Sequence, residues 1–454
     1  MMKTQIDKKP IIEKYEQQVI ANNTIKPEYY TKYNVKRGLR NPDGTGVLVG
    51  LTTIGHVLGY HIVEGEHTPV DGKLFYRGLE VTEIVKGFQK DNRVGFEETA
   101  YLLLFGQLPT KSELAEFCTM LDDVRELPPG FMENMIMKAP SRDIMNKLAR
   151  SVLAAYSYDD NPDDLSIQNN LRQCIELIAR FPTMAAYAYQ AKSHYHDGQS
   201  LVIHKGERGL STAENFLHLI RNDSVYTPLE AELLDLCLVL HAEHGGGNNS
   251  AFTVHVVTSS GTDIYSAISS GVGSLKGPKH GGANIKVMQM MEDIKANVKD
   301  WANESEVKTY LQKIIRKQAY DKSGLIYGIG HAVYTLSDPR AILLRDKARE
   351  LSKYKNSEEE FHLYELIEQL APVVFHEEKD SAKTVSANVD FYSGFVYRML
   401  NIPHDLYTPI FAIARIAGWA AHRIEELVSG GRIMRPAYKS VVNGNDYIPI
   451  AERG

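Results

Sequence analysis

Two glycine-rich corners that carry histidine bracket a run of small residues, and this stretch constrains the fold more than any other. The first corner reads His241-Ala242-Glu243-His244-Gly245-Gly246-Gly247-Asn248, and the second reads Lys276-Gly277-Pro278-Lys279-His280-Gly281-Gly282. The run between them, from Ala251 to Gly273, has the length of a helix that other helices can approach closely. At the corners, glycine leaves bare backbone beside the imidazoles, where a ligand can bind. The stretch predicts the wall and hinge of an active site.

Length and charge narrow the class of protein. With 454 residues, the chain exceeds the size at which one hydrophobic core keeps growing, so two domains are expected. A net charge of -6 provides no basic surface for nucleic acid, so a bound anion must be met by a few placed arginines. No apolar run is long enough to span a membrane. The three cysteines are far apart in apolar patterns, which indicates reduced thiols in a cytoplasmic protein.

The periodicity predicts an all-α fold with one minor β-hairpin near the N-terminus. Strand patterns occur at Val47-Leu48-Val49 and Lys73-Leu74-Phe75-Tyr76, with Asp71-Gly72 as the expected turn between them. From Glu80 onward every periodic segment is helical. One helix is expected to end at Arg180 and another to begin at Pro182.

The helix before the first corner begins with a capping box at Thr227 and Glu230. It is expected to end at Gly245, which places His241 and His244 in its last turn. His244, His280 and His331 each adjoin a glycine, so a ligand can approach the backbone there. The pair His241-x-x-His244 lacks the i, i+4 spacing of zinc proteases, and no cysteine pair supports a metal, so no metal site is expected.

Arg415 indicates an anionic ligand. It lies inside the apolar segment Ile410 to Trp419, and a buried cation needs an anionic partner. A structural Asp or Glu is the ordinary partner for a lone arginine. Arg340, however, follows Asp338-Pro339 in the first turn of another predicted helix, and arginine pairs with carboxylates through two hydrogen bonds. Together the two arginines suggest a di- or tricarboxylate ligand.

These motifs, in this order, resemble the citrate synthase family along nearly the whole chain. The matching segments are His241-Ala242-Glu243-His244, Gly277 to Asn284, Gly328-Ile329-Gly330-His331, Asp338-Pro339-Arg340-Ala341, and Asn388-Val389-Asp390-Phe391. The resemblance implies a two-domain helical fold, with a large domain at 1–283 and 390–454 and a small domain at 284–389. It also implies a homodimer with the active site in the cleft between the domains.

The resemblance further implies an acyltransferase of the tricarboxylic acid cycle that condenses acetyl-CoA with oxaloacetate and hydrolyses citryl-CoA. Coenzyme A thioester is then a substrate, and no other cofactor is needed. The catalytic residues would be His280, His331 and Asp390, and the oxaloacetate contacts His244, Asn248, Arg340, Arg415 and, from a partner subunit, Arg435. A 2-methylcitrate synthase using propionyl-CoA and, from other classes, a metal-dependent hydrolase and a non-catalytic helical scaffold remain as alternatives.

One position departs from the family pattern. Relatives carry Arg or Lys four residues after the histidine of the Gly-His motif, where it meets the phosphates of coenzyme A, but this chain has Thr335. The coenzyme A contacts are therefore expected at Lys276, Lys279, Lys322, Gly328 and Gly330.

Overall fold

The computed structural model describes residues 9–42, 44–63, 66–331, 333–379, 384–429, 431–442 and 444–453. Contacts divide the chain into two units, one drawn from the two chain ends (up to Gly50 and from Arg435) and one spanning Leu51–Met434. The second unit is not subdivided by this criterion, so the expected division at residues 284 and 389 remains a prediction.

The first unit contains two helices, α1 (Lys9–Asn23) and α2 (Pro27–Lys32), followed by a 3-10 turn at Arg37–Leu39. Within this unit, the ammonium of Lys439 lies 5.9 Å from the centre of the Tyr33 ring. Val47-Leu48-Val49 forms no strand, and Leu48 is 84% exposed, so the strand expected there is wrong. The described residues of this unit include no strand with which it could pair.

The second unit begins with a small antiparallel sheet of order β1-β2-β3, formed by β1 (Gly55–Val63), β2 (Glu66–Tyr76) and β3 (Leu79–Glu80). The predicted hairpin is therefore present but shifted, and Asp71-Gly72 lies inside β2 instead of in a turn. A side chain at Gly72 would overlap the carbonyl oxygen of Ser337, and one at Gly59 would overlap that of Val333. These glycines let the hairpin pack closely against the segment that follows His331.

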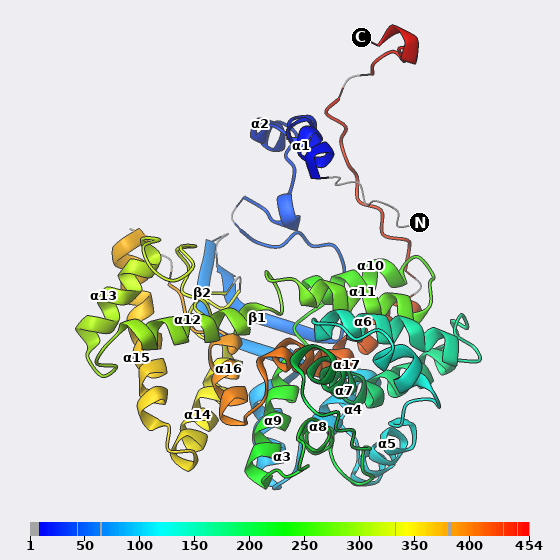
Figure 1. Cartoon of the computed structure of the whole chain (residues 1–454), viewed down its shortest axis with the longest axis vertical. Coiled ribbons are helices and arrows are strands. Elements are labelled where there is room, and N and C mark those ends of the chain that lie inside the picture. The colour runs from blue at the N-terminus through cyan, green and yellow to red at the C-terminus, as the bar shows by residue number, and fades with distance from the viewer. Residues whose placement is uncertain are drawn as a thin grey trace, which may run out of the picture. The chain divides into compact units, whose positions relative to one another are not determined.

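Helices make up nearly all the rest of the unit (Figure 1), which confirms the predicted all-α class. Their bounds are α3 (Val81–Lys90), α4 (Phe96–Phe105), α5 (Lys111–Val124), α6 (Ile144–Ala155), α7 (Ile167–Asp197), α8 (Thr212–Ile220), α9 (Pro228–His241), α10 (Asn249–Thr258), α11 (Ile264–Lys276), α12 (Ala283–Asn297), α13 (Glu304–Ile315), α14 (Pro339–Tyr354), α15 (Glu358–Lys379), α16 (Val389–Met399) and α17 (Tyr407–Val428). The capping box predicted at Thr227 is formed, and Thr110 forms another at the start of α5.

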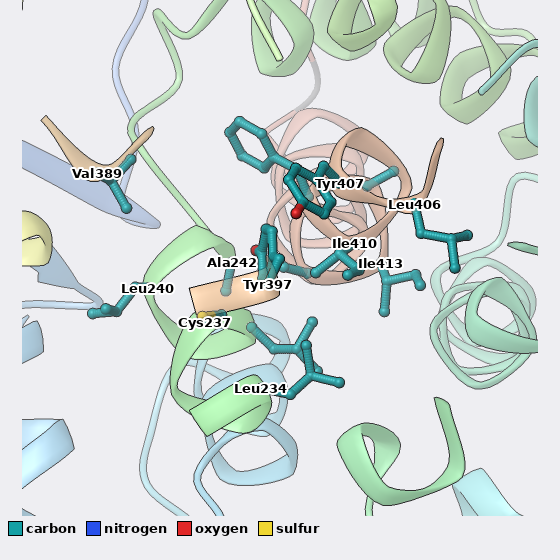
Figure 2. Close-up of a cluster of buried hydrophobic side chains, with 14 of the residues drawn as sticks. Leu234, Cys237, Leu240, Ala242, Val389, Tyr397, Leu406, Tyr407, Ile410 and Ile413 are labelled. Atoms are coloured by element: carbon teal, nitrogen blue, oxygen red, sulfur yellow. The ribbon is translucent and has the colours of Figure 1, made fainter. Parts of the chain in front are cut away.

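The central element is α17, in which every residue from Tyr407 to Arg423 is buried. It packs against α4, α7, α9, α10 and α11. Figure 2 shows part of this core, where Ile410 and Ile413 of α17 gather with Cys237 of α9 and Tyr397 of α16. A helix that is apolar on all sides must lie inside the protein, and this burial is what isolates Arg415 from solvent.

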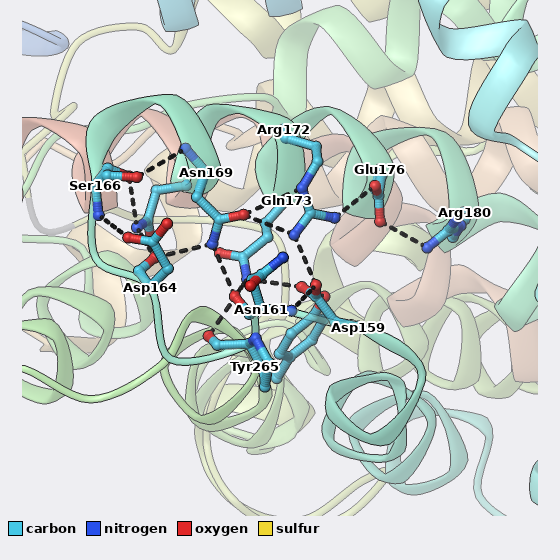
Figure 3. A network of polar contacts seen from close by, with 12 residues as sticks. Asp159, Asn161, Asp164, Ser166, Asn169, Arg172, Gln173, Glu176, Arg180 and Tyr265 are labelled. Atoms are coloured by element: carbon cyan, nitrogen blue, oxygen red, sulfur yellow. Dashed lines mark hydrogen bonds and ion pairs between the residues drawn. The ribbon is translucent and has the colours of Figure 1, made fainter.

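The break expected at Pro182 is wrong, because α7 continues through it as one helix of 31 residues. Phe181, Thr183 and Met184 beside the proline are at most 3% exposed. Their packing outweighs the cost of about 3 kcal/mol that an interior proline imposes. The start of α7 is held by a polar network in which Asp159 accepts hydrogen bonds from Arg172, Gln173 and Tyr265 (Figure 3).

The run from Ala251 to Gly273 is two helices instead of the single one expected. The chain turns between α10 and α11 at Ser259–Asp263, where Gly261 has a φ of +81°. The two helices pack so closely that a Cβ on Gly271 would lie 2.8 Å from Val254. Because the chain doubles back, the second corner returns to the first.

Candidate active site

The first corner follows the end of α9. His241 is the last helical residue and His244 lies in the loop beyond it, so the expected helix end at Gly245 is wrong. The buried hydroxyl of Tyr76 in β2 donates to the carbonyl of Val239 over 2.9 Å and helps to satisfy this helix end. The ring of His244 lies 5.3 Å from that of His331 and 5.7 Å from that of Tyr334.

The second corner meets the first at the start of α10. Nε2 of His280 lies 3.1 Å from Oδ1 of Asn248 and 3.0 Å from the hydroxyl oxygen of Ser250. Asn248 is also the N-cap of α10 and accepts from the backbone N–H of Ser250 over 3.3 Å. Trp419 of α17 donates its indole N–H to the Ser250 oxygen over 3.1 Å. His280 is therefore oriented by groups from two other helices.

The loop that carries His331 is tied to the segment that leads into Asp390. The backbone N–H of Gly330 donates to the carbonyl of Ser386 over 2.7 Å, and that of Asn388 donates to the carbonyl of Gly328 over 2.8 Å. The side chain of Asn388 caps α16 by accepting from the N–H of Asp390 and donates to the carbonyl of Gly330. His331 and Asp390 are thus held on two adjacent backbone segments.

The tautomer of His331 is fixed by its surroundings. Its Nδ1 accepts two backbone hydrogen bonds, from Val333 over 3.0 Å and from Tyr334 over 3.1 Å. A ring nitrogen that accepts carries no proton, so in the neutral ring the proton is on Nε2. Nε2 is consequently a hydrogen-bond donor.

Arg415 is a buried cation with unused donors. It is 1% exposed, and its Nε donates to the carbonyl of His241 over 2.7 Å. Neither Nη1 nor Nη2 has a hydrogen-bond partner among the described residues. Its guanidinium lies 4.8 Å from the centre of the Phe411 ring. Burial lowers the pKa of Arg415 to about 10, so it remains charged at neutral pH.

Arg340 is also buried, but it has a carboxylate partner. Its Nε donates to Oδ1 of Asp338 over 3.0 Å and its Nη2 donates to Oδ2 over 2.7 Å. Two of the three guanidinium nitrogens of Arg340 are therefore paired with a structural aspartate, which is the ordinary partner of a buried arginine. Tyr334 lies 5.6 Å from the guanidinium carbon. Asp338 also accepts from the N–H of Val389, which joins α14 to the start of α16.

The charge of Arg415 acts on three of the predicted site residues. Burial lowers the pKa of His280 to about 4, and Arg415 lowers it further in the same direction. The pKa of His244 is lowered by burial and then by Arg340, His331 and Arg415. Burial raises the pKa of Asp390 to about 6, although both arginines oppose that rise. The site therefore holds two neutral imidazoles and a carboxylate that titrates near neutrality.

The residues expected to bind coenzyme A do not form a cluster like that of the histidines, the arginines and Asp390. Lys276 pairs with Asp143 over 3.2 Å, and Lys279 and Lys322 are exposed. Gly328 and Gly330 have φ of +80° and +97°, and a Cβ on Gly328 would lie 2.8 Å from Phe391. Gly328 therefore permits close packing beside Asp390. Thr335 is partly buried, and Arg435 belongs to the first unit, where it is exposed.

Within the described residues, one group of side chains could hold a metal, and it lies apart from the histidines of the corners. It consists of His255, His422 and Glu425, whose ligand atoms lie within 4.8 Å of one another. The described helices include none long and apolar enough to cross a membrane.

Several residues of the site were missed from the sequence. Ser250 and Trp419, which orient His280, are 169 positions apart, so only the folded chain brings them together. The sequence predicts Asp338 only as the start of a helix, whereas the structure shows that it is also the partner of Arg340. The signal that could have found Ser250 is its place two residues after Asn248 at the beginning of α10.

Comparison with known proteins agrees with this geometry. The family model "Citrate synthase, C-terminal domain" matches residues 44–437. A citrate synthase of Synechocystis sp. is 35% identical over 412 residues, covering 90% of this chain and 92% of the relative. A 2-methylcitrate synthase of Shewanella oneidensis is 31% identical over 381 residues, covering 84% of this chain and 92% of the relative.

A solved structure shares the fold over most of the chain. It is citrate synthase of Thermoplasma acidophilum in a ternary complex with carboxymethyl coenzyme A and oxaloacetate, with a TM-score of 0.75 and 25% identity. The alignment covers 92% of this chain and 99% of that one. The chain therefore belongs to the citrate synthase family of acyltransferase-type condensing enzymes.

Proposed function

We propose that the protein condenses acetyl-CoA with oxaloacetate and hydrolyses the citryl-CoA intermediate to citrate and coenzyme A. The observation that carries this proposal is Arg415, a buried guanidinium near neutral His244 whose two Nη groups have no hydrogen-bond partner among the described residues. An unpaired buried cation is costly, and a substrate carboxylate relieves that cost. The Thermoplasma relative, which binds oxaloacetate together with a coenzyme A analogue, supports the assignment.

Oxaloacetate has two carboxylates and a ketone. Arg415 receives one carboxylate through Nη1 and Nη2 in a two-bond geometry. Arg340 offers Nη1, which makes no hydrogen bond to a described residue, and His244 adds a neutral contact. Asn248 supports the site by orienting His280. In a homodimer, Arg435 of the neighbouring copy completes the carboxylate contacts, as the family pattern implies.

His331 polarises the ketone. Because its Nδ1 accepts two backbone N–H groups, its Nε2 carries the proton and donates to the ketone oxygen. Carbon–carbon bond formation turns that oxygen into the hydroxyl of citrate and places negative charge on it. A donor fixed in advance stabilises this charge without reorganisation.

Asp390 and His280 generate the nucleophile, which is the enolate of acetyl-CoA. Asp390 takes a proton from the acetyl methyl group, and a base with a pKa of about 6 is ionised yet basic at neutral pH. His280 is neutral. The Ser250 hydroxyl donates to Oδ1 of Asn248 in this structure; in the reacting tautomer it donates instead to Nε2 of His280, which places the ring proton on Nδ1. Nδ1 then donates to the thioester oxygen as the enolate forms.

The second half of the reaction is hydrolysis of the citryl thioester, which makes the condensation irreversible in practice. Closure of a small domain, 284–389, over the large one keeps water out until that step. Lys276, Lys279, Lys322, Gly328 and Gly330 are the proposed surroundings of coenzyme A, with Thr335 in place of the usual basic residue. Each step uses side chains and the thioester itself, so no metal or redox cofactor enters the scheme.

The proposed location is the cytoplasm. The three cysteines are free thiols, and two of them, Cys174 and Cys237, are buried. Burial raises the pKa of both thiols to about 12, so they stay protonated and unreactive.

A second candidate is 2-methylcitrate synthesis from propionyl-CoA, because a relative with that name is 31% identical. The test is turnover of acetyl-CoA and propionyl-CoA with oxaloacetate, followed as release of free coenzyme A. A clear preference for propionyl-CoA would establish the second candidate instead. A metal-dependent hydrolase would lose its activity in excess EDTA, whereas condensation by the scheme above is expected to persist.

A further inference from the structure

A buried chain of four side chains runs beneath the first corner. Oε1 of Glu243 lies 3.0 Å from Nε2 of His422, and Nδ1 of His422 lies 3.0 Å from Nε2 of His255. Nδ1 of His255 then lies 3.0 Å from Oε2 of Glu426. The Glu243 and His422 side chains are 0% exposed. Nothing in the reaction scheme above uses these groups.

The hydrogen bonds determine the charge of this chain. Glu243 and Glu426 are acceptors when ionised, so the ring nitrogens that face them carry protons. The two imidazoles face each other through Nδ1 of His422 and Nε2 of His255, and a hydrogen bond there needs one more proton. The pair of rings therefore carries one positive charge, and Glu243 has a buried counterion.

The electrostatics assign that charge to His422. Burial acts to lower the pKa of His422, but Glu243 and Glu425 outweigh it and raise the pKa to about 9. Burial acts to raise the pKa of Glu243, but His422 and then Arg415 outweigh it, so the pKa is lowered. Glu243 and His422 thus form an ion pair at neutral pH.

Glu243 is held from three sides. A Cβ on Gly55, at the start of β1, would lie 2.8 Å from Cγ and Oε1 of Glu243, and one on Gly418 of α17 would overlap its Oε2. The carboxylate also accepts the backbone N–H of Gly245. His244 lies between Glu243 and Gly245, so this contact sets the turn that presents His244.

The same ion pair lies under the rest of the corner. A Cβ on Gly246 would make ordinary contacts with both rings, 3.5 Å from Cε1 of His422 and 3.7 Å from Nε2 of His255, so Gly246 lies beside the two imidazoles. Two residues later, Asn248 contacts His280. The segment from His244 to Asn248 is therefore anchored to Glu243 by the hydrogen bond at Gly245, and it passes beside both rings at Gly246.

We propose that the Glu243–His422 ion pair is a positioning device for oxaloacetate, which holds His244 and the following glycines in the binding geometry. The inference rests on the proposed function. Neither residue touches substrate; each acts through the backbone of the corner and through the charge that Glu243 places beside Arg415. The ion pair is expected to affect oxaloacetate far more than the acyl-CoA substrate.

The test compares His422→Gln and His422→Leu with a control, His218→Gln, which changes a histidine of α8 that bonds only the Lys205 carbonyl and a nearby exposed glutamate. Gln at 422 can still donate to Glu243 but carries no charge, whereas Leu removes both. Loss of a hydrogen bond to a buried charged group corresponds to roughly a ten- to hundredfold rise in the KM for oxaloacetate in the Leu variant. The Gln variant should show a smaller rise, of at least about threefold, because the donor remains.

The KM for acetyl-CoA should stay within about twofold in both variants, and isothermal titration should show the same loss of oxaloacetate affinity. A general structural defect would instead raise both KM values and lower the melting temperature. If the Leu variant does not fold, the Gln variant decides. An unchanged KM for oxaloacetate, or equal rises for both substrates, would overturn the inference. A wild-type enzyme that releases no coenzyme A would contradict the proposed function instead.

Discussion

The substitution Asp390→Asn tests the proposed base through both stability and catalytic rate, because it removes a buried carboxylate that destabilises the folded protein when it is charged. Oδ1 of Asp390 is buried and has no hydrogen-bond partner among the described residues. Burial raises the pKa of Asp390 from 3.8 to about 6. That difference corresponds to about 3 kcal/mol of destabilisation when the group is charged at neutral pH.

The sign follows from linkage. The folded-state pKa lies above the unfolded value, so the stabilising effect of the neutral carboxyl is complete below pH 4 and is lost as the pH rises through 6. Asn has no such titration. Asp390→Asn should therefore increase the free energy of unfolding by up to about 3 kcal/mol at pH 7.5 and by roughly half as much at pH 5.

The same change should nearly abolish condensation. Loss of a general base lowers kcat by roughly 10² to 10⁴. Oxaloacetate should still bind, because Arg415 and His244 are unaltered. Urea denaturation followed by circular dichroism at the two pH values measures stability, and release of coenzyme A measures the rate.

A matched control is Asp405→Asn, which removes an exposed carboxylate paired with Lys192. Exposed pairs contribute less than about 1 kcal/mol, so both stability and rate should change little. An Asp390→Asn variant that keeps its activity would refute the assignment of the base. A stability gain that is equal at pH 5 and pH 7.5 would refute the account of its pKa.

Three further predictions concern the same site. Arg415→Met should raise the KM for oxaloacetate by roughly a hundredfold, because it deletes the charged fork. The control is Arg423→Met, eight residues further along α17, at a buried arginine whose three guanidinium nitrogens are all hydrogen-bonded; it should lower stability without a selective effect on KM. Ser250→Ala should lower kcat about tenfold with little change in the KM for oxaloacetate, because Nε2 of His280 loses the hydroxyl that orients the ring. A change in that KM alone would contradict this role. The kcat/KM for acetyl-CoA should fall about tenfold per pH unit below 6 as Asp390 becomes protonated, and His280, with a pKa of about 4, should not contribute above pH 5; a profile that stays flat down to pH 5 would oppose it.

Much of the site could be predicted from the sequence because its residues lie in short, glycine-marked motifs. His244, His280 and Arg415 were identified from their immediate neighbours, and the structure brings charge from Arg415 onto both histidines. Their relative arrangement could not be predicted, because it depends on the turn at Ser259–Asp263. A small-residue run reads equally well as one helix or two, and only the packing of α10 on α11 distinguishes them.

The misplaced strand has a similar cause. In a sequence, a glycine such as Gly59 or Gly72 indicates a turn or the interruption of a strand. In the structure, these glycines lie inside strands, where Gly59 leaves room for the carbonyl of Val333 and Gly72 for that of Ser337. In the same way, Pro182 signals a helix end, but tertiary packing keeps α7 continuous. The ion pair of Glu243 with His422 joins residues 179 positions apart, which no local pattern reveals.

The most direct test of the central claim is steady-state turnover of the purified protein with oxaloacetate and either acetyl-CoA or propionyl-CoA. Release of coenzyme A should require both substrates, citrate should accumulate in equal amount, and kcat/KM should be higher for acetyl-CoA. Release without oxaloacetate, absence of citrate, or a clear preference for propionyl-CoA would contradict the assignment as a citrate-forming enzyme.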